Sequence, residues 1–380
     1  MAFYGSYNYA TSVGVESIDS VIYKLAAHHA PFLRKYLNLT PAGTQADPEV
    51  KGATHNWVEK PLKSMRDKVH TAIAASATTL YTANEFARYI AGKTVILVGQ
   101  EYMTVSAVGS YGSGKRALTV ARGFNSSTDA AHNPGDNIQI MNITPEAWVV
   151  DRSDAQFAEK KYNVCQILSR AISLSGTAQA TKTYGNEFNF DVQAAELIPE
   201  MFQELENLLI SGTYYSSTTD RMMGGMKYYV QSAMKFDNAG NKLTLATLDA
   251  DLDALRNVGV DTNKLSILCG QNVRAALSNQ KALTVTDAYN NKKLDFGVTM
   301  IMTPQGYRLP IDPDPVGDSL NPDEYFLFPG DSIQVKFLRK LVREKLAKVG
   351  DSDEEFLVME PTAEFKGWSN NGALWRYGIK

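Results

Sequence analysis

The chain has 380 residues, a formal net charge of −3 and 44% hydrophobic residues. This length suffices for two or three domains, and the slight acidic excess argues against a dedicated nucleic-acid binder, which is normally strongly basic. Cys165 and Cys269 lie far apart, which favours a reducing compartment over a disulfide framework or a zinc site. The N-terminus lacks the features of a signal peptide and no apolar run approaches the ~20 residues that cross a bilayer, so we expect a soluble cytoplasmic product with no membrane partner.

Residues 1–55 are rich in small, polar and aromatic side chains and hold one helix-like stretch, with Ile18, Val21, Ile22 and Leu25 near one face. They are too poor in apolar residues to fold alone, so we expect an extended arm. Between Thr71 and Asn142 the stretches TVILV, YMTVSAV, ALTVARG and NIQIM alternate apolar and polar residues and are separated by turn residues. This pattern predicts a small β-rich unit.

Helices are predicted next. A shared face of Phe157, Val164, Leu168 and Ala171 favours a helix within residues 148–176. A longer helix is expected over Asp191–Ser211, bent at Pro199 and ended by Gly212. Its apolar stripe comprises Ala194, Ile198, Met201, Leu205 and Leu208. Its acids, which lie largely off this stripe, are Glu196, Glu200, Glu204 and Glu206.

The C-terminal part mixes both element types. RMMGGMKYYVQS predicts a turn and a strand, and LTLATLDADLDALRNVG an amphipathic helix whose solvated face carries Asp249, Asp251 and Asp253. KLSILCGQNVRAAL reads as strand, turn and helix with Cys269 in the core, and FGVTMIMTPQGYRLPIDP as strand. Residues 325–379 read as several strands. The order of elements predicts an α+β chain.

The motifs do not favour nucleotide binding, metal binding or catalysis. GSYGSGKR at residues 109–116 lacks the Ser or Thr of a phosphate-binding loop and precedes a strand, which favours a hairpin loop. The aspartates of DADLDAL lack the glycine and closing glutamate of a calcium loop. The histidines are confined to the N-terminal part, far in sequence from Cys269; they are His28, His29, His55, His70 and His132. We therefore expect no catalytic residue, no cofactor and no metal.

The densest basic run is RKLVREK, from Arg339 to Lys345. In a strand, alternate residues point to opposite faces, so half of these charges would lie on each side. The run could contact nucleic acid or an acidic partner, or form a solvated strand face. The sequence leaves both interpretations open.

Taken in order, several stretches resemble one family. They are HNWVEKPL, TTLYTANEFARYIAGKTVILVGQEYMTVSAV, LTVARGFNSSTDAAHNPGDNIQI, YNVCQILSRAISLSGTAQA, RMMGGM and YFLFPGDSIQVKFLRKLVREKLAKVGDSDEEFLVMEPTAEFKG. The chain is similar to the major capsid proteins of tailed bacteriophages, which share the Johnson (HK-ninety-seven-type) fold, and within them to the group with a β insertion in the extended loop.

The resemblance implies a domain organisation. Its parts are an N-terminal arm (1–55), an extended loop with the β insertion (56–150), peripheral-domain helices including a spine helix (151–219), an axial domain (220–325) and a peripheral β tail (326–380). The spine helix corresponds to Asp191–Ser211, and its acids are expected to face solvent or neighbouring subunits. It also implies a non-enzymatic protein that self-assembles from hexamers and pentamers into an icosahedral or prolate shell around double-stranded phage DNA, without sequence-specific binding. Scaffold, portal and decoration proteins are its implied partners, and the host cytoplasm its place of assembly.

The residues expected at subunit interfaces are charged. At the root of the extended loop they are Glu59, Lys60, Lys63 and Arg66, in a segment of alternating charge that we expect to be exposed; the others are Glu200, Glu204, Arg339 and Arg343. Covalent cross-links through asparagine are known in this fold, but in WSNNGALW an Asn-Gly turn is favoured for Asn370 and Asn371. The alternatives to a phage head protein are a tail or decoration protein, a bacterial nanocompartment shell, and a hydrolase using Cys269 or a histidine.

Overall fold

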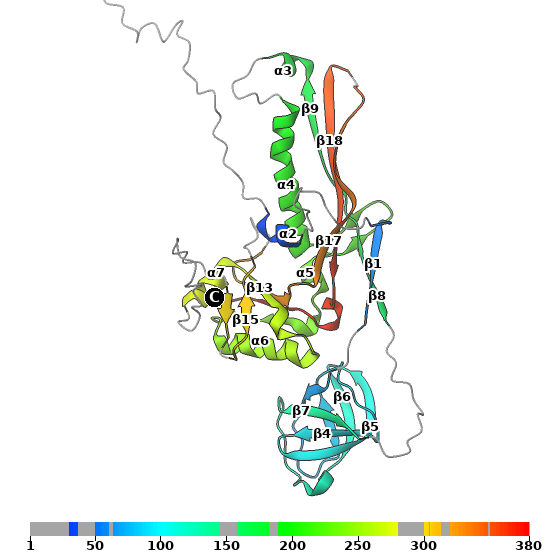
Figure 1. The fold of residues 1–380 in the computed structure, drawn as a ribbon, viewed down its shortest axis with the longest axis vertical. Coiled ribbons are helices and arrows are strands. Elements are labelled where there is room, and N and C mark those ends of the chain that lie inside the picture. The colour runs from blue at the N-terminus through cyan, green and yellow to red at the C-terminus, as the bar shows by residue number, and fades with distance from the viewer. Residues whose placement is uncertain are drawn as a thin grey trace, which may run out of the picture.

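The computed structural model describes residues 30–36, 50–60, 64–143, 158–181, 189–279, 300–303, 305–312, 320–348 and 350–379. Three hydrophobic cores organise them: one beneath a long helix, one in the C-terminal sheet and one inside a β-rich unit. Figure 1 shows that the long helix and its sheet lie at one end of an elongated chain and that the β-rich unit lies at the other end.

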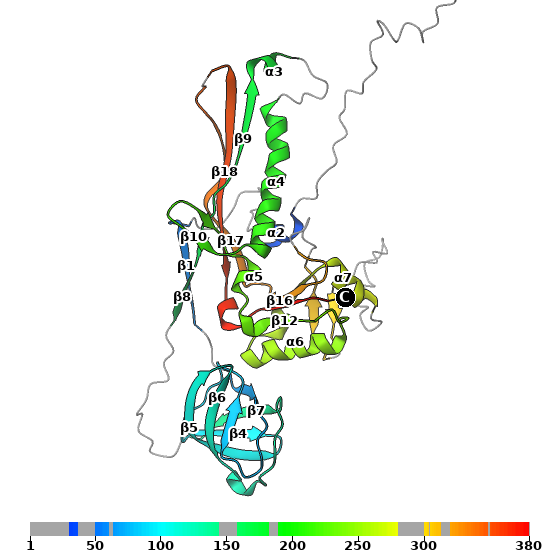
Figure 2. The same cartoon turned by 180° about the vertical axis from the view of Figure 1, so that it is seen from behind.

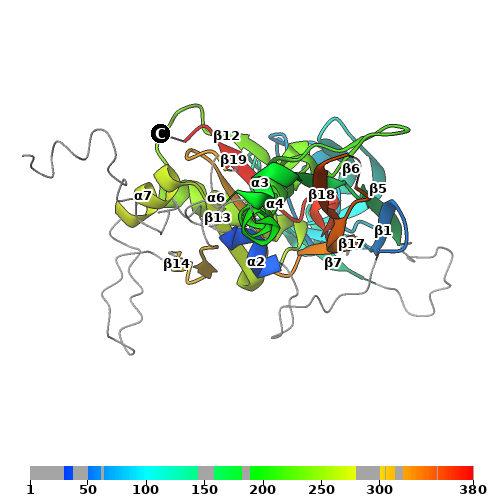
Figure 3. The same cartoon turned by 90° about the horizontal axis from the view of Figure 1, so that it is seen from above.

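The long helix α4 (Phe190–Ser211) lies along a three-stranded sheet of order β17-β18-β9 (Figure 1). These strands are β17 (Ile333–Lys345), β18 (Ser352–Phe365) and β9 (Leu168–Ser175). The Asn189 side chain caps the first turn, the helix continues through Pro199, and the Gly212 N–H bonds to Leu208 O at 2.9 Å. Seen along the molecule's long axis, α4 stands end-on beside β18 (Figure 3). The predicted single helix and its end are confirmed.

The apolar stripe of α4 faces the largest core. Ala194, Met201 and Leu205 are buried as predicted, together with Leu209 and Ile210. Ile198 and Leu208 are only partly buried at the margin of this core. The apolar side of α4 is therefore wider toward its C-terminal end than the predicted stripe.

The prediction that Glu206 faces solvent is wrong, because the short helix α2 (Pro31–Tyr36) covers it. The buried carboxylate accepts the N–H of Leu33 at 2.8 Å. Amides in the first turn of a helix have no intrahelical partner and attract negative charge, so Glu206 stabilises α2 where it meets α4. Phe32 and Leu33 are fully buried in the main core, and so part of the expected arm belongs to the core.

The helix predicted within residues 148–176 is wrong where the structure describes it. Residues 158–175 instead form β8 (Glu159–Val164) and β9, and β9 pairs with β18 over eight residues of its length. Leu168 and Ile172 are buried, and a spacing of four suits both a strand and a helix face. Ala171, from the predicted helical face, is exposed, and Phe157 lies outside the described residues.

The β-rich unit is a small barrel. Its six-stranded sheet has the order β2-β7-β4-β5-β6-β3, and a bridge from Val69 to Thr82 joins the two edges. The strands are β2 (Arg66–Lys68), β3 (Thr79–Thr82), β4 (Thr94–Val98), β5 (Glu101–Gly112), β6 (Lys115–Ala121) and β7 (Asn137–Asn142). A short helical turn, η1 (Phe124–Ser126), follows β6. The GSYGSGKR stretch forms the β5–β6 turn with positive φ at Ser113 and Gly114, which confirms the hairpin.

A two-stranded stem of β1 (Thr54–Glu59) and β8 lies between the barrel and the rest of the chain (Figure 2). The barrel also contacts helix α6 (Leu245–Val258). The Oγ of Ser64 and the Nδ2 of Asn84 both donate to the carbonyl of Asn257, at 2.9 and 2.6 Å. The last carbonyls of a helix lack intrahelical partners, so the barrel satisfies one of them.

The C-terminal sheet has the order β12-β19-β16-β13, and the hairpin β14–β15 lies beside it through a bridge from Ile267 to Ile311. The strands are β12 (Lys235–Asp237), β13 (Leu265–Cys269), β14 (Met300–Met302), β15 (Arg308–Pro310), β16 (Tyr325–Pro329) and β19 (Leu374–Tyr377). The predicted strand, turn and helix around a buried Cys269 are confirmed, with α7 at Gln271–Asn279. The remaining short elements are α3 (Gly176–Ala180), β10 (Tyr215–Ser216), β11 (Arg221–Met222), η3 (Ser232–Met234), η4 (Thr262–Lys264) and η5 (Trp368–Asn370).

Two predictions for this region need correction. The strand expected in RMMGGMKYYVQS ends at Met222 in β11, and Met226–Tyr229 instead form the short helix α5. Asp251 is not on a solvated face: it is buried and accepts hydrogen bonds from the Tyr325 hydroxyl and from Arg376 Nε at 2.8 Å. The helix prediction itself is confirmed as α6, and the aspartate was misplaced because its partners are remote in sequence.

We expect Glu206→Ala to lower the free energy of unfolding by about 1–3 kcal/mol, because it leaves a buried Leu33 N–H without its acceptor. Glu200→Ala is the matched control, since Glu200 is exposed on the same helix and its loss should change stability by less than about 0.5 kcal/mol. Urea denaturation of both variants measures the difference. Equal effects would contradict the role of Glu206.

Candidate functional site

The loop root is where the structure departs most from the expected exposed segment. Glu59 is only 8% exposed, and its carboxylate accepts bonds from Trp57 Nε1 at 2.7 Å, Gly367 N at 2.7 Å and Asn370 Nδ2 at 3.0 Å. The expected exposure is therefore wrong for Glu59. Its charge is used inside the chain, where it ties the end of β1 to the turn that follows β18.

The other residues predicted at the loop root differ in their surroundings. Lys60 and Arg66 are exposed, on either side of the entry to the barrel. Lys63 lies outside the described residues. On α4, Glu200 is exposed. A role for these residues in subunit contacts stays a prediction.

Three further predicted residues form ion pairs along α4 and its sheet. Glu204 on α4 pairs with Arg170 of β9 at 2.6 Å, and Arg343 of β17 pairs with Asp191 at 2.7 Å. Arg339 donates to Glu360 of β18 at 2.8 Å. These pairs connect α4 to the strands of its sheet, and the strands to each other; together these elements form a strut. Each partly exposed pair contributes only ~0.2–1 kcal/mol to stability. The main effect of the pairs is to align α4 with its strands and to offset each other's charges.

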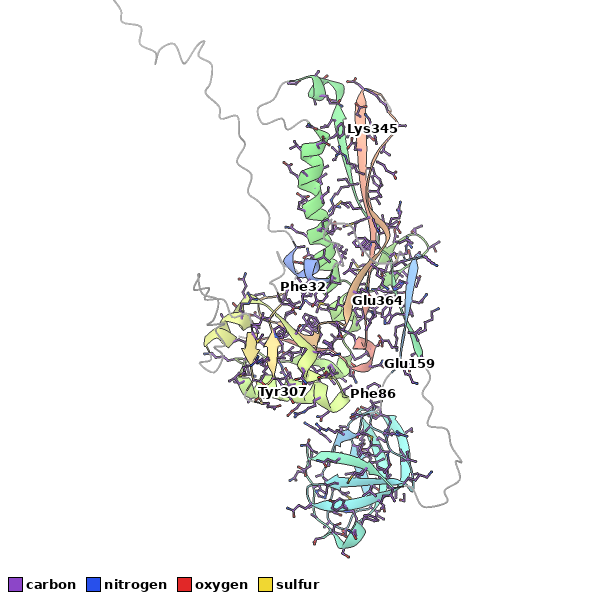
Figure 4. The ribbon with its side chains drawn as sticks, viewed as in Figure 1. Phe32, Phe86, Glu159, Tyr307, Lys345 and Glu364 are labelled. Carbon is purple, nitrogen blue, oxygen red and sulfur yellow. The ribbon has the colours of Figure 1, made fainter. Side chains whose placement is uncertain are left out.

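The basic run itself is the exposed end of β17, as a strand reading requires. Arg343 also pairs with Glu355 of β18, so two carboxylates offset its charge. Figure 4 labels Lys345 near the end of β17 that is remote from the C-terminal sheet. The prediction of a strand is confirmed, and contact with nucleic acid or an acidic partner stays open.

Glu364 of β18 is a second internal anchor of the stem. Its carboxylate accepts from Lys336 Nζ at 2.8 Å and lies 2.5 Å from Nε2 of His55 on β1. Burial raises the pKa of Glu364, but the hydrogen bonds from His55 and Lys336 outweigh burial and hold that pKa at about 2. Figure 4 shows Glu364 where the stem approaches the main sheet. His55 thus has a structural partner and lies among charged groups.

Tyrosines gather at the junction of the stem with α5, a feature that no spacing in the sequence predicted. The rings of Tyr162 and Tyr214 are 5.6 Å apart and those of Tyr214 and Tyr228 are 5.8 Å apart. Tyr229 donates to the carbonyl of Tyr162 at 2.7 Å. With Lys235 and their neighbours these rings line an open hollow of about 450 Å³.

Two buried carboxylates in the barrel each accept several hydrogen bonds. Oδ1 of Asp67 accepts three backbone N–H groups, and its Oδ2 accepts the Tyr89 hydroxyl. Glu101 binds Arg122 and His132. Burial raises the pKa of Glu101, but bonds from Arg122, the Ala130 N–H and His132 bring it to about 2. These groups stabilise the barrel from within.

The residues considered for chemistry are not assembled into a site in the described part of the chain. Cys269 is buried in the C-terminal core and His132 belongs to the barrel. His28 and His29 lie outside the described residues. Among the residues that the structure describes, no cluster of three or more His, Cys, Asp or Glu side chains could hold a metal, and no helix is long and apolar enough to cross a membrane.

Comparison with known proteins identifies the family of this chain. The model of the SU10 major capsid protein family matches residues 5–376. The chain belongs to the SU10 major capsid protein family. The predicted relationship to phage major capsid proteins is confirmed, and the protein forms a capsid shell.

The chain is similar to several solved structures. The capsid of a native GTA particle is 10% identical, with a TM-score of 0.51 over 99% of this chain and 98% of that chain. A structure of Mycobacterium phage Bobi is 9% identical, with a TM-score of 0.47 and 99% of each chain covered. The holo-SrpI encapsulin complex of Synechococcus elongatus PCC 7942 is 10% identical, with a TM-score of 0.42 over 59% of this chain and 78% of that chain. No curated protein matches. The predicted α+β capsid fold is confirmed.

We expect the stabilising contribution of Glu364 to be lost in acid. Its folded pKa of about 2 lies below the ordinary 4.5, so the folded state binds this proton more weakly than the unfolded chain. Its contribution is fully present above pH 4.5 and is lost as the pH falls toward 2.

Thermal melts of wild type and Glu364→Gln between pH 7 and pH 3 measure this effect. The variant should be less stable at pH 7, and the gap should close as the pH falls below 4.5. Glu354→Gln on the same strand is the exposed control, with a small gap at every pH. A gap for Glu364→Gln that stays constant over this range would contradict the assignment.

Proposed function

We propose that this chain is the major head protein of a tailed phage and that its copies form five-fold and six-fold rings in an icosahedral or prolate shell around double-stranded DNA. The observation that carries the proposal is the family match over residues 5–376. Closed assemblies of one chain require the same surface to meet its neighbours in several related environments.

The strut of α4 and its sheet suits this function. A helix of 22 residues spans about 33 Å at ~1.5 Å per residue, so it can brace a thin shell over a large part of a subunit. The side of α4 that faces the core is apolar, and Glu200 is exposed on the other side. The ion pairs of Glu204, Arg339 and Arg343 hold the strut together within one copy.

For the contacts between copies we propose the exposed charges Lys60, Arg66 and Glu200, with Lys63 as a further candidate from the sequence. Such pairs are individually weak and sensitive to salt, but a shell repeats each one at every subunit. Asn370 donates to the buried Glu59, so we propose an assembly without asparagine cross-links.

The proposed place of assembly and partners follow from the same function. Assembly takes place in the host cytoplasm, with a scaffold, a portal and decoration proteins as partners. The chain encloses DNA without reading its sequence, and the net charge of −3 supports weak contact between DNA and the shell wall.

Expression of the chain alone and with its scaffold tests the proposal. We expect size-exclusion chromatography to yield capsomers or particles, and negative-stain images to contain closed shells. Tubes would favour a tail protein. A strictly monomeric protein under every assembly condition would contradict the proposed function.

A further inference from the structure

Helix α2 lies where two parts of the chain meet. Figure 4 labels Phe32 of α2 between α4 and the C-terminal sheet. Phe32 and Leu33 are fully buried in the core beneath α4. The ring of Tyr36 lies 5.0 Å from that of Phe32 and 6.3 Å from that of Phe328 on β16. This helix of six residues therefore packs against both parts.

The polar contacts of α2 divide between the same two parts. On one side, the Leu33 N–H bonds to Glu206 of α4. On the other side, the Tyr36 hydroxyl donates to Oδ2 of Asp312 at 2.5 Å, and Lys35 Nζ donates to Oδ1 of the same carboxylate. Residues 33–36 thus connect α4 with Asp312 across a single helical turn.

Asp312 belongs to the hairpin β14–β15 and is only 1% exposed. It follows β15, and its N–H bonds to the Ile267 carbonyl of β13 at 2.8 Å. A parallel bridge between Ile267 and Ile311 lies beside this bond, and Arg274 donates to the backbone carbonyl of Asp312 at 3.3 Å. The position of Asp312 therefore depends on how the hairpin packs on the C-terminal sheet.

The buried charge of Asp312 depends on α2. The partners of its carboxylate in the described part of the chain, Lys35 and Tyr36, both belong to that helix. Burial and the charge of Asp312 raise the pKa of Tyr36, so its hydroxyl stays a hydrogen-bond donor. A buried carboxylate that loses its partners is strongly unfavourable. If α2 leaves, Asp312 must reach water, which requires its bond to Ile267 to break.

We propose that α2 is a clasp that couples two contacts. When α2 leaves α4, the hairpin β14–β15 loosens from the C-terminal sheet, and when the hairpin loosens, α2 leaves α4, because coupling between sites is reciprocal. In a shell, one fold meets its neighbours in several related environments, and the clasp transmits a change at α2 to the hairpin. That use rests on the proposed shell function, whereas the coupling itself does not.

Native-state hydrogen exchange of the unassembled wild-type chain tests the coupling directly. The amides of Leu33 and Asp312 should exchange through one opening, with opening constants equal within about threefold and the same dependence on urea. The amides of β16, inside the same sheet, should be protected at least about tenfold more strongly and serve as the internal control.

Two results of this experiment would overturn the proposal. One is a different urea dependence for the amides of Leu33 and Asp312, which would mean that the two contacts open independently. The other is exchange of both amides only together with those of β16, since no separate opening of the clasp then exists.

Two buried aspartates of the C-terminal part offer a matched pair of variants. Asp312→Asn removes the charge that α2 holds, while Asp251→Asn removes a buried charge that lies against Arg376. We expect Asp312→Asn to speed exchange of the Leu33 amide at least about tenfold, and Asp251→Asn to leave it within about threefold of wild type. Equal acceleration by both variants, or none by Asp312→Asn, would contradict the coupling.

The outcomes for the clasp and for the shell are separable, because both exchange experiments use the unassembled chain. If Asp312→Asn does not fold by circular dichroism, exchange of the wild-type chain decides. If exchange is coupled but no particles form under any assembly condition, the proposed shell function fails and the clasp stands. If particles form but the amides of Leu33 and Asp312 open separately, the clasp alone fails.

Discussion

The packing of α4 on the β17-β18-β9 sheet is the constraint on which the rest of this subunit depends. Met201, Leu205 and Leu209 are fully buried at this contact, in the largest core of the chain. Because burial of a large aliphatic side chain contributes about 1.5–3 kcal/mol, this contact outweighs the local cost of Pro199 within the helix. It holds together segments from both halves of the sequence, and α2, the stem and the C-terminal turn are all attached to it.

Those attachments use buried carboxylates. The short segments α2 and β1 place Phe32, Leu33 and Trp57 in the main core. Their positions are then fixed by hydrogen bonds to Glu206, Glu364 and Glu59. Hydrogen bonds to a charged group are roughly twice as strong as neutral ones, and they require specific geometry. The stem is thereby anchored at both ends of β1, while the barrel has a core of its own.

The parts of this fold that local periodicity determines could be predicted from the sequence. Helices α4 and α6 and strands β4 to β7 each carry a clear period, and their predictions are confirmed. Residues 158–175 were misassigned because apolar spacing of four fits both a helix and a strand, and pairing with β18, far along the chain, decided between them. The roles of Glu59, Glu206 and Asp251 could not be predicted, since their partners lie 308, 173 and 125 residues away. The hollow lined by Tyr162, Tyr214 and Tyr228 could not be predicted for the same reason, because it joins separate segments of the chain.

A cryo-electron microscopy reconstruction of the assembled particle tests the central claim most directly. Superposition of the independent subunits measures whether α4 and its sheet move as one body between environments. The account predicts that these elements superpose within about 1 Å in every copy, while the stem and barrel differ in orientation. A helix that splits at Pro199, or that separates from the sheet in some copies, would contradict the account.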